Sequence, residues 1–192
     1  MKRRDHLVKA MLALMRKSPF FSSIIIGLKL VEVNDENMIM ATDGKRLLYN
    51  MDRLSTIKVN EIREILTHEA MHISNKHHIR MKRCKPKYQS KIEKYDLDYT
   101  KVFNVAADLA INSILFECSD YDWEVSDLII DGCIPGIEPY QNFPKKKSTE
   151  WYLKELITDL DDAANKSDQA LRNLIDDRGL ADKECSVIES SE

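Results

Sequence analysis

Residues 66–80, LTHEAMHISNKHHIR, place four of the chain's five histidines within eleven positions. The part of this stretch up to His77 belongs to a longer segment, residues 59–77, in which apolar residues recur with the 3.6-residue period of a helix. On such a helix His68 and His72 are four positions apart, so both imidazoles project toward the same point. Glu69 directly follows the first histidine. The stretch therefore predicts a helix that carries an H-E-x-x-H pattern.

Each residue of this pattern suits metal-assisted hydrolysis. Neutral imidazole nitrogens are ordinary zinc ligands, and zinc can lower the pKa of a water to about 7. A neighbouring carboxylate can then take the proton as the water attacks a carbonyl carbon. We expect His68 and His72 to bind a metal and Glu69 to be the catalytic base. The alternative is an exposed helix with solvated histidines, because so short a pattern also arises by chance.

A catalytic zinc ion usually has three protein ligands, and the sequence offers a first candidate for the third nearby. His78, ten residues after His68, matches the metzincin spacing H-E-x-x-H-x-x-G-x-x-H. That pattern has glycine where this chain has Asn75, and asparagine is the next best residue for a left-handed backbone. The metzincin arrangement is therefore one of two predictions for the site.

The second candidate is Asp108, which lies in the apolar segment VFNVAADLAINSIL, residues 102–115. Asn104, Asp108 and Asn112 recur every fourth residue and form one polar stripe on this predicted helix. A buried carboxylate needs a compensating partner, and a metal ion is the strongest one available. A hydrogen-bonded contact between helices would explain the stripe equally well, so the residues alone leave both interpretations open.

The other elements follow from periodicity and turn residues. Asp43-Gly44 lies between two apolar runs and suits a tight hairpin turn. Either strand of that hairpin could offer an edge to an extended substrate. The expected elements are a helix over 3–17 ended by Pro19, a strand-like segment over 24–33, antiparallel strands over 37–41 and 46–50, an exposed loop with a short helix over 80–98, a buried helix over 99–116, a loop over 119–148, and helices over 149–160 and 169–175.

The composition is that of an ordinary globular protein, with 43% hydrophobic and 32% charged residues and a net charge of −3. No apolar run of about 18 residues predicts a membrane span, and no membrane partner is expected. The four cysteines form no C-x-x-C pair, so we expect reduced thiols and a cytoplasmic location. A basic run over residues 76–88 can contact phosphates, but a solvated loop is the commoner case, and nucleic-acid binding is not expected.

Several motifs in order resemble a known family, the "putative metallopeptidase domain" that lies N-terminal to von Willebrand factor A-like domains in bacterial and phage proteins. The similarity extends over about residues 35–157. The motifs that carry it are ATDGKRLLYN at 41–50, HEAMHISNKH at 68–77 followed by Arg80, FNVAADLAIN at 103–112 and STEWYLKEL at 148–156.

This resemblance implies a zincin-like α+β fold, with a small mixed or antiparallel sheet packed on the H-E-x-x-H helix and a second buried helix. It also implies that Asp108 is the third ligand of a Zn2+ ion, although two histidines and a carboxylate would suit Mn2+ or Fe2+ as well. His77 matches an additional histidine of the family. On a continuous helix it would lie about 180° from His68, so we expect it to be a ligand only if the helix ends first.

We therefore expect a zinc-dependent metallopeptidase domain over residues 1–160, followed by an acidic helix and partly disordered tail over 161–192. Its substrate would be a protein or peptide. The chain ends after the metallopeptidase region, so a von Willebrand factor A-like domain would be absent or supplied in trans by a partner protein. The alternative is a catalytically silent, metal-stabilised protein-binding module of the same fold. The sequence singles out no residue that would stabilise an oxyanion.

Overall fold

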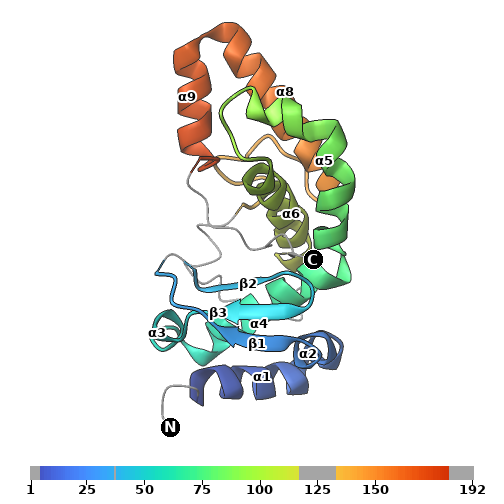
Figure 1. Ribbon diagram of the computed structural model, residues 1–192, viewed down its shortest axis with the longest axis vertical. Coiled ribbons are helices and arrows are strands. Elements are labelled where there is room, and N and C mark those ends of the chain that lie inside the picture. Colours follow the sequence, from blue (N-terminus) through green and yellow to red (C-terminus); the bar gives the residue numbers. More distant parts are fainter. Residues whose placement is uncertain (1–4, 37, 117–132, 182–192) are drawn as a thin grey trace. The chain divides into compact units, whose positions relative to one another are not determined.

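The computed structural model of the protein describes residues 5–36, 38–116 and 133–181 (Figure 1). These residues combine helices with a three-stranded mixed sheet, which confirms the α+β class. The chain divides into two compact units, and the dividing point lies between Arg80 and Met81. In the described residues, the first unit holds the sheet and the H-E-x-x-H helix, and the second is helical. None of the described helices has the length and apolarity that a membrane crossing requires.

In the first unit, two N-terminal helices pack on the H-E-x-x-H helix. The helix predicted over residues 3–17 is confirmed as α1 (Asp5–Lys17), which buries Leu7, Ala10 and Leu14. The H-E-x-x-H helix is α4 (Val59–Ser74), and Ile62, Leu66 and Ala70 on its apolar face are fully buried. The helix therefore has the buried apolar face that its periodicity predicts.

The strand predicted over residues 24–33 is wrong in its first part. Helix α2 (Pro19–Ile26) occupies that part, and only β1 (Lys29–Glu32) is extended. Pro19 does not only end α1. It also begins α2. Proline suits the first helical position because its φ is already helical and because the backbone N–H at that position has no partner within the helix in any case. Short apolar runs do not by themselves distinguish a buried helix from a strand.

The sheet has the order β1-β3-β2. Strands β2 (Met40–Thr42) and β3 (Arg46–Tyr49) are antiparallel, which confirms the predicted hairpin, and β1 pairs in parallel with the other side of β3. Because β3 is central, both of its edges are already paired. Of the two hairpin strands predicted to offer an edge to a substrate, only β2 has one among the residues that the structure describes.

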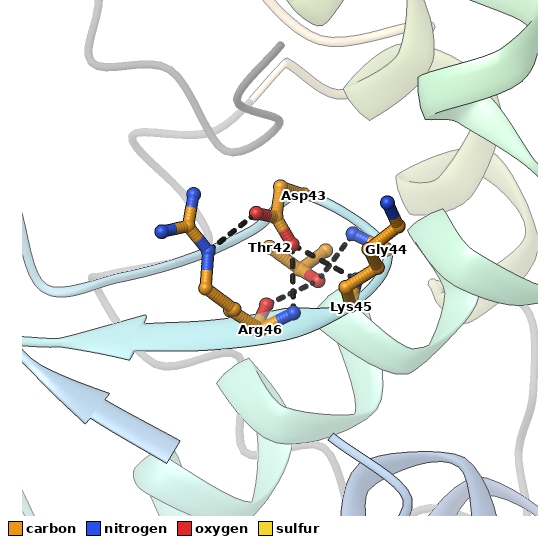
Figure 2. Close-up of polar contacts among 5 residues, drawn as sticks. All are labelled: Thr42, Asp43, Gly44, Lys45 and Arg46. Atoms are coloured by element: carbon orange, nitrogen blue, oxygen red, sulfur yellow. Dashed lines mark hydrogen bonds and ion pairs between the residues drawn. The ribbon is translucent and has the colours of Figure 1, made fainter. Parts of the chain in front are cut away.

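Asp43 holds the turn between β2 and β3 (Figure 2). Its Oδ1 accepts hydrogen bonds from the backbone N–H groups of Lys45 at 2.8 Å and Arg46 at 2.7 Å, and its Oδ2 accepts one from Arg46 Nε at 2.6 Å. Thr42 Oγ1 accepts a hydrogen bond from the Gly44 N–H at 3.1 Å. Burial acts to raise the pKa of Asp43, but these N–H groups and the Arg46 charge outweigh it and hold the pKa below its usual value.

Asp43 makes the stability of the fold depend on pH. Because its pKa is lower in the folded chain, its contribution is complete above the unfolded pKa of about 3.9 and is lost as the pH falls through the folded pKa. We expect Asp43→Asn to lower the free energy of unfolding by about 1–3 kcal/mol near neutral pH. When urea unfolding is measured from about pH 7 to pH 3, the free energy of unfolding should therefore fall less in this variant than in wild type.

The exposed Asp5, which forms an ion pair with Lys9 on the surface of α1, provides the control. Asp5→Asn should leave the wild-type pH dependence almost unchanged, because an exposed ion pair contributes little. Equal pH dependence in Asp43→Asn and wild type would contradict the role of the Asp43 carboxylate.

Gly44 makes room for a histidine at the tip of the same turn. Its φ is +86°, and a Cβ atom at this position would lie 2.8 Å from Cε1 and Nε2 of His78. Real Cβ atoms essentially never approach another atom so closely. The His78 ring therefore packs directly on the hairpin backbone, which is possible only because residue 44 is glycine.

We expect Gly44→Ala to lower the free energy of unfolding by about 2–4 kcal/mol, because a left-handed backbone strains any side chain and the new methyl group collides with His78. Gly179→Ala is the matched control: its φ is +56° and a Cβ would meet no atom within 4 Å. In that variant the free energy of unfolding should fall only by the cost of the strained backbone, about 1–2 kcal/mol. In urea unfolding, adding His78→Ala to Gly44→Ala should recover part of the loss. No recovery would contradict the proposed collision.

The second unit contains α6 (Tyr99–Leu115), α8 (Thr149–Lys166) and α9 (Asp168–Asp177). Helix α6 packs against α8, and α8 packs against α9. The predicted helix over 99–116 is confirmed, and Asp98 caps its start by accepting hydrogen bonds from two backbone N–H groups. The two later helices are also confirmed, although α8 is six residues longer than expected. The loop predicted over 119–148 lies partly outside the described residues, and the predicted disordered tail lies outside them from residue 182.

The exposed loop predicted over residues 80–98 is wrong. Most of it is helix α5 (His77–Glu93), which contains Pro86 and also includes the point that divides the two units. Proline removes one backbone hydrogen bond from a helix, but the buried side chains of this segment keep a helical spacing. Those side chains are Met81, Cys84, Tyr88 and Ile92. The many lysines between them obscured this pattern. Cys84 and Cys133 are both buried thiols.

Candidate metal centre

Helix α4 brings the two histidines of the H-E-x-x-H pattern together. Their Nε2 atoms are 2.9 Å apart, and the rings meet edge to face with centroids 4.7 Å apart. A tetrahedral zinc ion with Zn–N bonds of about 2.0–2.1 Å would separate two such nitrogens by about 3.3 Å. His68 and His72 therefore fit two positions around one ion after a movement of only a few tenths of an ångström.

The residues of this helix turn differ in their access to solvent. The side chains of Glu69 and His72 are 2% and 1% exposed, whereas His68 is half-buried. Burial lowers the local dielectric constant and strengthens every charge interaction there. Of these three side chains, His68 is therefore the most accessible to solvent.

Helix α4 ends immediately after these residues. Its last residue is Ser74, Asn75 follows with φ −81°, and Lys76 has a left-handed φ of +56°. Asn75, which the metzincin arrangement would place in the left-handed conformation, remains helical, and the chain reverses one residue later. Helix α5 then begins at His77.

His77 returns toward the H-E-x-x-H turn because of this break. Its Nδ1 lies 3.0 Å from Nδ1 of His72, the ring centroids are 5.0 Å apart, and His77 is fully buried. The 180° separation from His68 that a continuous helix would impose does not apply. Sequence reasoning missed this contact, although Asn75 signalled that a break was near. His78 packs on Gly44 of the hairpin.

In the second unit, Asp108 lies on the polar stripe of α6. Asn104, Asp108 and Asn112 are 2%, 7% and 5% exposed, so the stripe is buried. Asn112 Nδ2 donates a hydrogen bond to the backbone oxygen of Cys133 at 3.0 Å. This hydrogen bond therefore joins Asn112 to a residue outside the helices, and not to a neighbouring helix. Within the part of the chain that the structure describes, His68, His72 and Asp108 are candidate metal-binding residues.

Two comparisons relate the chain to known sequences. The chain matches the model of a family described as a putative metallopeptidase domain over residues 2–184. It is also 30% identical over 136 residues to a protein of Thermotoga maritima named "Uncharacterized protein", with 69% of this chain and 31% of the relative covered. The chain thus spans about a third of that relative's length. No solved structure matches the chain. The family match covers nearly the whole sequence, and the chain belongs to the putative metallopeptidase domain family.

Proposed function

We propose that the protein is a zinc-dependent metallopeptidase in which His68, His72 and Asp108 bind the metal and Glu69 is the general base. The observation that carries this proposal is the pair of histidine Nε2 atoms, 2.9 Å apart on a helix turn that also holds Glu69. Family membership supports the same reaction class.

The third ligand is proposed from chemistry and from the family resemblance. Catalytic zinc sites combine three protein ligands with an open position, and two histidines with one carboxylate form a common set. Asp108 is a buried carboxylate on an otherwise mainly apolar helix, where a negative charge requires a compensating partner. Alanines at positions 106, 107 and 110 leave space beside it for a close approach. The proposed site therefore takes ligands from both α4 and α6.

In this proposal the protein's own residues move the proton. A bound zinc ion would supply Lewis acidity, which makes water a better nucleophile at neutral pH and polarises the peptide carbonyl. Glu69 accepts a proton from the attacking water as the new C–O bond forms. It then delivers that proton to the leaving nitrogen as the C–N bond breaks, and the carboxylate is regenerated. Glu69 is 2% exposed, so its side chain is shielded from bulk solvent.

The test is peptide hydrolysis by the purified protein, with metal content measured on the same samples by mass spectrometry. About one zinc ion per chain together with turnover that requires Glu69 would support the proposal. Manganese or iron in place of zinc would keep the ligand set and change the cofactor. Zinc without turnover on any peptide library would favour the alternative, a silent metal-stabilised binding module. The cytoplasmic location and a partner with a von Willebrand factor A-like domain remain predictions.

A further inference from the structure

His77 contacts the proposed metal ligand His72 on the side away from His68. The Nδ1 atoms of His72 and His77 are 3.0 Å apart, whereas the Nε2 atom of His72 faces Nε2 of His68. His72 therefore uses both of its ring nitrogens, one toward each histidine. Both His72 and His77 are buried, with exposures of 1% and 0%.

This contact constrains the protons of the two rings. A neutral imidazole has one N–H donor and one acceptor nitrogen, so one of the two Nδ1 atoms must donate to the other. A metal-binding His72 has its lone pair on Nε2 and its proton on Nδ1. In that state His72 Nδ1–H donates to His77 Nδ1, and His77 has its own proton on Nε2.

We propose that His77 is a positioning residue that selects the metal-binding tautomer of His72 and fixes its ring. This inference rests on the proposed function, because it assigns the proposed ligand its supporting hydrogen bond. Histidine ligands commonly donate their second N–H to a neighbouring acceptor, and loss of that acceptor typically weakens metal binding 10–100-fold. Here the acceptor is a second histidine, which the left-handed backbone at Lys76 turns toward His72.

Two substitutions at position 77 distinguish the effect of the hydrogen-bond acceptor from the effect of the space that the ring fills. His77→Asn keeps an acceptor, because the asparagine side-chain oxygen can occupy the place of Nδ1. His77→Leu fills similar space without an acceptor. His78→Asn is the matched control, since it makes the same chemical change at the next residue, whose ring packs on Gly44.

The first measurement is zinc affinity, determined by competition with a chromophoric chelator. We expect His77→Leu to bind zinc about 10–100-fold more weakly than wild type, while His77→Asn and His78→Asn stay within about threefold. Wild-type affinity in folded His77→Leu would overturn the proposal. Equal losses in His77→Asn and His77→Leu would overturn it too, because shape rather than the acceptor would then matter. A complete loss of zinc in both would identify His77 as a direct ligand.

The second measurement reads the hydrogen bond without metal or activity. Long-range proton–nitrogen NMR spectra of metal-free protein with 15N-labelled histidine report which ring nitrogen holds the proton. We expect the His72 proton on Nδ1 in wild type and in His77→Asn, and a mixture of tautomers in His77→Leu. A His72 proton on Nε2 in wild type would overturn the proposal. Wild-type protein that binds no zinc would refute the proposed function. The spectra would still show, independently of zinc, whether His72 donates a hydrogen bond to His77.

Discussion

Glu69→Gln loses peptide hydrolysis by about 10²–10⁴-fold and keeps its zinc, if Glu69 is the general base of the proposed reaction. Glutamine has nearly the same size as glutamate, but its amide cannot accept a proton from water at neutral pH. The substitution therefore removes the proton transfer while it leaves His68 and His72 in place. Initial rates on a peptide substrate and zinc content on the same preparation would check both parts of this result.

Glu61→Gln is the matched control for this experiment. Glu61 lies on the same helix and accepts a hydrogen bond from the Lys58 backbone N–H at 3.0 Å. Glutamine can replace glutamate in such a capping role, so this variant should hydrolyse peptides at close to the wild-type rate. Hydrolysis that survives Glu69→Gln would refute the assignment of the base. Loss of zinc in Glu69→Gln would instead mean that Glu69 contributes to metal binding.

Asp108→Ala should reduce the zinc content from about one ion per chain to almost none after dialysis. A catalytic zinc site normally needs three protein ligands, and this substitution leaves only the two histidines of α4. The loss should appear in mass spectrometry of the purified protein, and peptide hydrolysis should disappear with it. Circular dichroism would show that the helical content is retained.

Two further variants make this result specific. Asn104→Ala changes the same stripe of α6 one turn earlier, at a residue that is also buried, and should keep zinc. His78→Ala removes the ligand that the metzincin spacing would use and should keep zinc as well. Loss of zinc with His78→Ala but not with Asp108→Ala would establish the metzincin arrangement. A wild-type protein that takes up no zinc would leave α4 as a polar helix face.

The parts of the fold that sequence alone predicted are those with a long, regular pattern. The periods of α1, α4 and α6 and the Asp43-Gly44 turn identified their elements correctly. The failures have physical causes. Helix α2 is a short apolar run, and its packing rather than its sequence pattern decides its conformation. Helix α5 continues through Pro86 because burial of its side chains stabilises the helix by more than the loss of one hydrogen bond costs.

The candidate site divides in the same way. The four-residue spacing of His68 and His72 was sufficient to predict that their rings meet, because a regular helix fixes that relation. The contact of His77 with His72 could not be derived from helical spacing, because it depends on the backbone angle of a single residue, Lys76. Helical periodicity places His77 on the wrong side of α4, and only the structure shows the reversal.

The left-handed residue at the end of α4 also determines how similar sequences should be compared. One residue inserted between Ser74 and His77 would leave the H-E-x-x-H pattern unchanged but would direct the next histidine elsewhere. A search for the five-residue pattern would score the two sequences alike, although only one would retain the His72–His77 contact. For this protein the informative unit is therefore the ten-residue string His68–His77 together with its helix break, and its length matters as much as its letters.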